Sequence, residues 1–165
     1  MTSLNRVIPL LRALIVLVFA GLVVAQFLSL PGEFSQQAYE APRLGPVPWI
    51  LLAFAILEVV CVQVVLVCIW RLLTLIRADR IFSEKAFAWV DVMTWTIAAA
   101  WLMLFAVSAF LMAVFLMTPE LRDPGNGILL TGMVLIGGVV VLVVVVLRAL
   151  LHQAATMRSD LEEVI

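Results

Sequence analysis

The sequence predicts an all-α integral membrane protein: an antiparallel bundle of four transmembrane helices with an amphipathic cytoplasmic extension of the last helix. Apolar residues make up 65% of the 165 residues and charged residues only 13%. A soluble domain typically has about 45–50% apolar and about 25% charged residues. The apolar residues are also concentrated in four long stretches, separated by polar or Pro- and Gly-rich segments. Lipid is therefore the expected solvent.

Each apolar stretch is long enough to cross the roughly 30 Å of hydrocarbon in a bilayer. We treat 1–165 as a single domain with a helical tail at 152–165. The fourth stretch contains a valine-rich run at 139–146 that would be typical of a buried strand in water. A lone strand in lipid leaves its backbone unpaired, so a helix is expected instead. The four spans are predicted at 7–30, 48–76, 84–117 and 128–151.

Signals at the ends of the spans define the connections. Ser83 is expected to cap the third helix, with Glu84 in its first turn and with Phe82 and Phe87 placed for a hydrophobic staple. On the opposite side, Pro and Gly residues predict turns and loops after the first and third spans. These are Pro31-Gly32, Pro42, Gly45-Pro46, Pro48, Pro119 and Asp123 to Gly127.

Orientation follows from the Lys and Arg residues beside the spans, because cytoplasmic loops carry the excess. One side has eight such residues and the other has two. We therefore expect both ends of the chain in the cytoplasm and a location in the cell (inner) membrane. The eight are Arg6, Arg12, Arg71, Arg77, Arg80, Lys85, Arg148 and Arg158, against Arg43 and Arg122.

The first apolar stretch also resembles a secretory signal peptide. Basic residues precede it, and Val23-Val24-Ala25 offers a small-residue cleavage site. The apolar run continues through Leu30, however, which is longer than a typical signal-peptide core. We interpret it as a retained first span. Cleavage would leave three spans with the same orientation.

The chemistry of several functional classes is missing from the sequence. A single His, no Gly-rich phosphate loop and no nucleophile with a base argue against an enzyme. Scattered cations and a net charge of -1 argue against direct nucleic-acid binding. Cys61 and Cys68 would lie about 10 Å apart along a helix, too far for a disulfide, and they do not complete a metal shell. We expect no catalytic residue, metal or cofactor.

The most informative single residue is Glu58, in the second span. It would lie about 13 Å below the outer boundary, near the middle of the bilayer. An ionised carboxylate there is costly, so Glu58 should be protonated or paired. It is either a proton or cation site, or a protonated side chain whose hydrogen bond to another helix stabilises the packing. Gln63 lies roughly 140° around the same helix, on a different face. Gln26, near the outer end of the first span, is an interhelical partner candidate at shallower depth.

Other polar and small residues are expected to serve packing. Thr94, Thr96, Ser108 and Thr131 can hydrogen-bond to carbonyls of their own helices. His152 is interpreted as a polar-face residue rather than a pH sensor. Small residues let membrane helices approach closely. Such residues mark either the bundle seam or an oligomer face: Gly21 and Ala25, and the series Ala99, Ala106, Ala109 and Ala113.

The tail continues the helical periodicity of the fourth span, with an apolar face and an acidic polar face. Anionic lipid would not favour an acidic face, so the tail suits a protein surface. That surface is either the inner loop of this chain or a cytosolic partner. The candidate docking residues are Arg77, Arg80 and Lys85 in the loop and Asp160, Leu161, Glu162 and Glu163 in the tail.

Three segments carry a family resemblance that extends over essentially the whole chain: 62–76, 81–92 and the closing Leu161-Glu-Glu-Val-Ile165. Together they resemble a bacterial family of small four-span membrane proteins known only as a domain of unknown function. The resemblance implies four spans, a cytoplasmic carboxyl end and no catalytic motif. Members are often encoded beside a small Cro/C1-type helix-turn-helix regulator, which implies a regulatory partner of that type.

The sequence thus favours a non-catalytic membrane protein that acts through partner binding or regulation by its cytoplasmic loop and tail. The alternative is a small transporter or a proton- or cation-conducting bundle that uses Glu58. The oligomeric state stays open.

Overall fold

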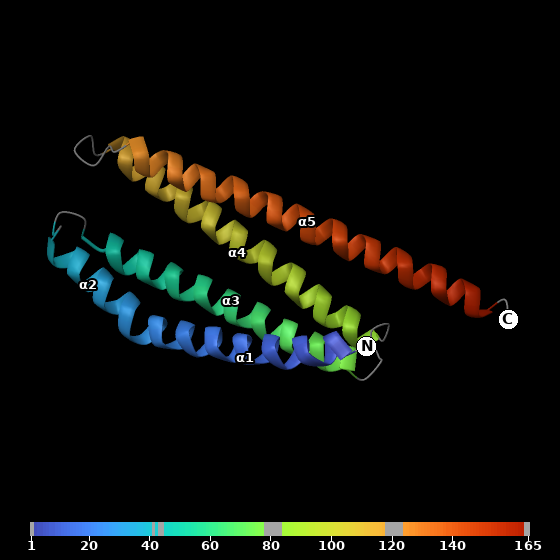
Figure 1. Cartoon of the computed structure of the whole chain (residues 1–165). Coiled ribbons are helices and arrows are strands. Elements are labelled where there is room, and N and C mark those ends of the chain that lie inside the picture. Colours follow the sequence, from blue (N-terminus) through green and yellow to red (C-terminus); the bar gives the residue numbers. More distant parts are fainter. Residues whose placement is uncertain (1, 41, 43–44, 78–83, 118–123, 164–165) are drawn as a thin grey trace. The chain divides into compact units, whose positions relative to one another are not determined.

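The computed structural model describes residues 2–40, 42, 45–77, 84–117 and 124–163. Side chains are described for 8–40, 42, 45–76, 86–117, 125 and 127–157. Helices make up nearly all of these residues, as the apolar stretches predicted (Figure 1). The chain divides into two compact units, Met1–Asp79 and Arg80–Ile165, each of which is a helical hairpin.

The first hairpin packs one long, interrupted helix against α3 (Val47–Arg77). The interrupted helix consists of α1 (Thr2–Val24), the single wide turn η1 (Ala25–Ser29) and α2 (Leu30–Glu40). Its axis bends between α1 and α2 (Figure 1). The contacts of α1 with α3 bury Ile8 and Ile15, which are one heptad apart.

The predicted turn at Pro31-Gly32 is wrong, because the helix continues to Glu40. Proline has no N–H and its ring presses on the carbonyl four residues earlier, which here is that of Phe27. Phe27 lies inside η1, a π-helical turn of five residues. Such a bulge widens the backbone and is a recognised cause of helix bending. The breaker signal thus bends the helix and does not end it.

The connection to α3 is a turn, as predicted. Gly45 adopts φ +53°, a left-handed conformation that glycine accepts without steric cost, and its N–H donates to the Pro42 carbonyl at 3.3 Å. The Ile50 N–H donates to the Pro46 carbonyl at 3.1 Å. Pro48 lies in the first turn of α3, where a missing N–H costs nothing.

The second hairpin packs α4 (Glu84–Met117) against α5 (Pro124–Glu163). Proline is favourable as the first residue of α5. The predicted helical tail is confirmed, since α5 has 40 residues and a length of about 60 Å. Glu84 begins α4 as the capping pattern predicted, while Ser83 and Phe82 lie outside the described residues.

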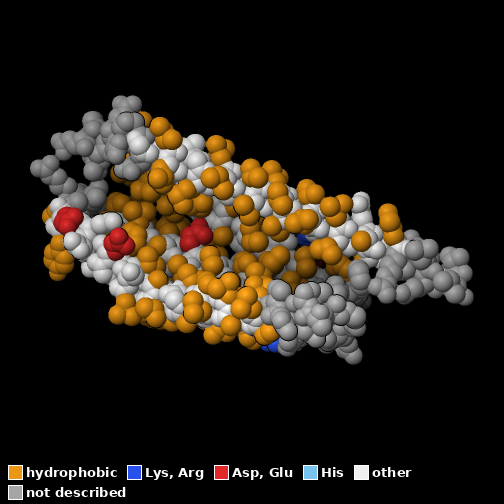
Figure 2. Space-filling model, viewed as in Figure 1, with side chains coloured by type: hydrophobic (Ala, Val, Ile, Leu, Met, Phe, Trp, Pro, Cys, Tyr) orange, Lys and Arg blue, Asp and Glu red, His pale blue; other side chains and the backbone are white. Residues whose placement is uncertain are grey.

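Within the described ranges, four helical segments are long and apolar enough to cross a membrane: Ile8–Glu40, Val47–Ile76, Ala86–Met117 and Gly127–Met157. Apolar side chains cover the faces of the helices that are in view, and charges there are sparse (Figure 2). Leu10 is 74% exposed and Leu142 is 67% exposed. Such surfaces are stable in contact with lipid, so the chain is a multi-pass membrane protein.

Candidate functional site

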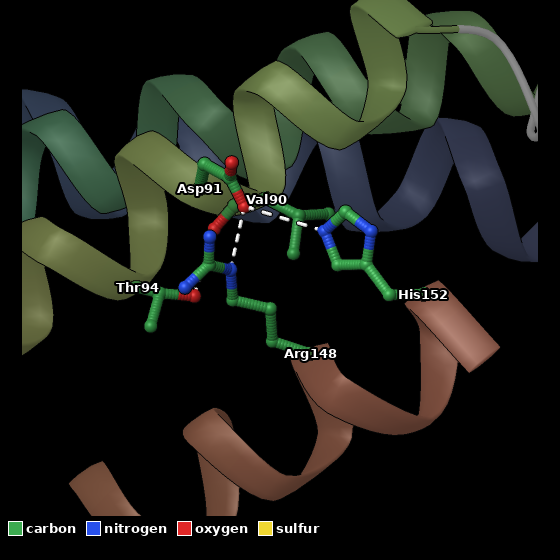
Figure 3. Close-up of polar contacts among 5 residues, drawn as sticks. All are labelled: Val90, Asp91, Thr94, Arg148 and His152. Atoms are coloured by element: carbon green, nitrogen blue, oxygen red, sulfur yellow. Dashed lines mark hydrogen bonds and ion pairs between the residues drawn. The ribbon is translucent and has the colours of Figure 1, made fainter.

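Three polar side chains of the second hairpin converge at the end where α4 begins. Arg148 donates from Nε to Asp91 Oδ1 at 2.6 Å, and His152 Nε2 lies 3.8 Å from the same oxygen (Figure 3). The imidazole of His152 also stacks on Phe87, with ring centroids 5.0 Å apart. We call Asp91, Arg148 and His152 the polar clamp.

The local sequence explains how the clamp forms. Arg148 and His152 are four residues apart on α5, so they project from the same face of the helix. Asp91 lies two turns into α4, and the antiparallel hairpin brings it opposite them. The sequence indicated only a polar-face position for His152. A carboxylate and an Arg-x-x-x-His pair at the same end of neighbouring spans was the signal that could have identified the clamp.

The clamp ties α5 to α4 and leaves the end of α5 projecting. From Asp91 back to Glu84, α4 covers about 10 Å, whereas from Arg148 to Glu163 α5 covers about 22 Å. The last helical residues of α5 therefore extend roughly 12 Å beyond the start of α4, and Figure 1 shows this overhang. The overhang carries the acidic sequence Asp160 to Glu163.

The tail and loop residues that sequence analysis named for docking lie where side chains are not described. Arg77, Lys85, Asp160, Leu161, Glu162 and Glu163 are in helices whose backbone is described, and Arg80 is outside the described residues. Their contacts with each other stay a prediction.

The structure brings together two of the three predicted intramembrane polar residues. Gln63 donates from Nε2 to Gln26 Oε1 at 3.1 Å, and Gln26 donates a long hydrogen bond of 3.5 Å to the Ile56 carbonyl. Sequence analysis placed Gln26 at a shallower depth because the first span was expected to end at Leu30. Since the helix runs to Glu40, Gln26 lies about 21 Å from that end of the helix, close to the distance of about 24 Å between Gln63 and the start of α3.

Glu58 stands apart from this pair. Its Oε1 atom is buried and has no hydrogen-bond partner among the described residues. Buried polar atoms nearly always have a partner in native structures, so an unpaired carboxyl oxygen within a span is a candidate site for a proton or a cation. Cys61, on the same helix, is a free thiol, and so is Cys68, as predicted.

The seam of the second hairpin is built around Trp101. Its indole Nε1 donates to the Val134 carbonyl at 2.9 Å, and the ring covers Gly137 and Gly138. A Cβ on Gly137 would lie 2.8 Å from Trp101 Cδ1. The alanines that the sequence suggested as seam residues are exposed in the structure, so they do not form the contact with α5: Ala99, Ala106, Ala109 and Ala113.

The hydroxyl predictions are confirmed for three residues and wrong for one. Thr94, Thr96 and Thr131 donate to the carbonyls of Val90, Val92 and Gly127, four residues earlier in each case. Ser108 Oγ is buried without a hydrogen-bond partner among the described residues. A serine side chain has the same option of bonding to its own helix, and the structure gives no physical reason why Ser108 does not use it.

Comparison with known proteins adds one finding. A family model described as a protein of unknown function (DUF2975) matches residues 32–165. The match covers α3, α4, α5 and most of α2. Neither the curated proteins nor the solved structures gave a match.

Proposed function

This chain belongs to the DUF2975 family of proteins of unknown function, and on that premise we propose that it is a non-catalytic membrane protein that binds a cytosolic protein through the projecting end of α5. The observation that carries the proposal is the overhang: the clamp holds α5 at Arg148 and His152, and about ten residues of helix continue beyond the last clamp residue.

Charge and amphipathicity indicate what the overhang would bind. The sequence of the tail predicts an acidic polar face and an apolar face that includes Leu161, Val164 and Ile165. Helices of this kind place apolar anchors in the groove of a partner protein. An acidic polar face favours a basic protein surface and disfavours anionic lipid. A basic helix-turn-helix regulator, the partner type that the family resemblance implies, fits these requirements.

The proposal includes an orientation in the bacterial inner membrane with both ends in the cytoplasm. Eight Lys and Arg residues flank the spans on that side and two on the other. A protease site and tag after Ile165 should be cleaved in inverted membrane vesicles and protected in right-side-out vesicles. Cleavage in the right-side-out vesicles alone would place the tail outside the cell and contradict the proposal.

The test of the tail is co-purification from native membranes in mild detergent. Full-length protein is compared with a version that ends at Met157, which keeps the whole clamp, and with the neutral tail Asp160→Asn, Glu162→Gln and Glu163→Gln. Glu33→Gln with Glu40→Gln, which changes two exposed acids of α2, is the control. The protein captured by the full-length chain is then purified and its Kd is measured.

We expect the Kd to rise at least about ten-fold for the truncated and neutral tails, which corresponds to about 1.4 kcal/mol. The control should bind as the unchanged protein does. Equal binding by all four proteins would show that the tail is not the docking element. Loss of the cytosolic protein from every variant, the control included, would show that the loss is not specific to the tail and would also count against the proposal.

A second candidate function rests on the unpaired Glu58 Oε1: a small transporter or proton- or cation-conducting protein in which Glu58 carries the charge. If this is correct, Glu58→Gln should reduce proton-coupled flux into liposomes by about ten-fold or more, since the amide cannot titrate. Glu33→Gln, a substitution in α2, should leave the flux unchanged. If neither protein gives a flux above that of empty vesicles, Glu58 would have a structural role in helix packing instead.

A further inference from the structure

The first hairpin contains a basic and aromatic cluster at the end where α1 begins, which no function discussed above uses. Arg12 donates from Nη2 to Thr74 Oγ1 at 3.0 Å, and Thr74 in turn donates to the Trp70 carbonyl at 3.0 Å. The guanidinium carbon of Arg12 lies 5.1 Å from the centroid of the Trp70 ring. These contacts hold the guanidinium in place at the edge of α3.

Within the part of the chain whose side chains are described, Arg12 has no counter-charge. No carboxylate among the described residues forms an ion pair with it, and its Nε atom is buried without a hydrogen-bond partner there. Arg12 belongs to the segment Ile8–Glu40, which is long and apolar enough to cross a membrane. A guanidinium in this position favours an anion, and its planar fork suits a phosphate.

Two adjoining apolar grooves lead away from Arg12. The first has a volume of about 310 Å³ and is lined by Ile15, Val16, Phe19, Ala20, Val67 and Trp70. The second, of about 540 Å³, shares Val16, Ala20 and Trp70 with the first and is completed by Arg12, Ala13 and Leu17. All of these residues belong to α1 and α3.

The length and depth of the grooves match a lipid leaflet. From Arg12 to Ala20 the grooves follow α1 for about 12 Å, close to the half-thickness of roughly 15 Å of a bilayer hydrocarbon core. Arg12 lies at one end of the grooves, and the other end, at Phe19 and Ala20, is apolar. Basic pockets between membrane helices on the cytoplasmic side are typical sites for acidic phospholipid headgroups.

We propose that the Arg12–Trp70 cluster and the two grooves form a binding site for one acidic phospholipid, whose phosphate contacts Arg12 and whose acyl chains lie in the grooves. The headgroup phosphate accepts hydrogen bonds from the guanidinium. The acyl chains cover Val16, which is 54% exposed. This inference is independent of the proposed tail function, because it uses residues of the first hairpin alone.

Lipid titration of the purified full-length protein in neutral detergent, followed by native mass spectrometry, tests the site. The probes are phosphatidylglycerol, phosphatidylethanolamine with the same acyl chains, and inorganic phosphate. Arg12→Gln is compared with Arg71→Gln, an arginine of α3 that lines neither groove, and Arg12→Lys keeps the charge. Val16→Trp fills both grooves, and Leu14→Trp is its control because Leu14 is 56% exposed and lines neither groove.

We expect the unchanged protein to bind phosphatidylglycerol at least about five-fold more tightly than phosphatidylethanolamine, because one basic side chain near an anionic headgroup contributes a preference of this size. Arg12→Gln should abolish that preference, while Arg71→Gln and Arg12→Lys should retain it. Val16→Trp should weaken the binding of both lipids, and Leu14→Trp should not.

Three results would overturn the proposal. In the first, Arg12→Gln and Arg71→Gln reduce the preference equally, so that the effect is one of general charge. In the second, inorganic phosphate competes as well as the lipid, so that the site is a headgroup site without acyl chains. In the third, Val16→Trp binds both lipids as the unchanged protein does, so that another element occupies the grooves.

Discussion

Gly137→Ala is expected to destabilise the α4–α5 hairpin by about 1–3 kcal/mol, the usual cost of overpacking a close contact. The new Cβ would lie 2.8 Å from Trp101 Cδ1, closer than carbon atoms can approach. The indole cannot simply rotate away, because its Nε1 donates to the Val134 carbonyl at 2.9 Å. Relief of the clash therefore costs either this hydrogen bond or the packing of the two helices.

The neighbouring glycine provides the control. A Cβ on Gly138 would meet Trp101 at 3.5 Å, an ordinary contact distance. Alanine also favours a helix over glycine by about 1 kcal/mol, so Gly138→Ala should leave the hairpin unchanged or stabilise it. Unfolding in mixed micelles with increasing dodecyl sulfate, followed by tryptophan fluorescence, measures both variants. If both glycines tolerate alanine equally, Trp101 does not pack against Gly137 as described.

Loss of the clamp is the second large expected effect. Replacing Asp91 by lysine sets a positive charge opposite Arg148. It also removes the charged hydrogen bond of 2.6 Å from Arg148 Nε to Asp91 Oδ1. Because the two side chains are 38% and 33% exposed, solvent screens part of the interaction. We expect a loss of about 1–2 kcal/mol in the stability of the second hairpin.

A double-mutant cycle isolates this pair. Asp91→Lys and Arg148→Glu should each destabilise, and the combined swap should recover about 1 kcal/mol of the summed loss. The unfolding midpoint of all four proteins in the same micelles gives the coupling. Strictly additive losses would show that Asp91 and Arg148 act independently and that α5 is not held at this point.

Features that depend on one helix at a time could be predicted from the sequence. Hydropathy over a window identifies spans because every backbone group in lipid must be satisfied within its own helix. The four apolar helices and the helical tail were predicted for this reason. The error at Pro31 has the same origin, since proline is a stop signal in water but only a bend in lipid, where a wide turn accommodates it.

Features that depend on the register of two helices could not be predicted. The contact of Trp101 with Gly137 and the ion pair of Asp91 with Arg148 both require the offset of α4 relative to α5. That offset is set by side-chain fit along the seam, and helical periodicity within one segment does not contain it. Glu58 could be singled out from the sequence because a carboxylate within a span is costly wherever it points, and its role stays a prediction.

The wide turn η1 has a consequence for the register of the first hairpin. A π-helical turn contains one residue more than an α-helical turn, and one residue corresponds to about 100° of rotation about the axis. The residues of α2 that face α3 are therefore not those that would continue the heptad of Ile8 and Ile15 in a regular helix. In a relative with one residue fewer between Ala25 and Ser29, a regular helix would rotate these residues of α2 away from α3. The number of residues in this stretch is therefore a structural determinant of the fold.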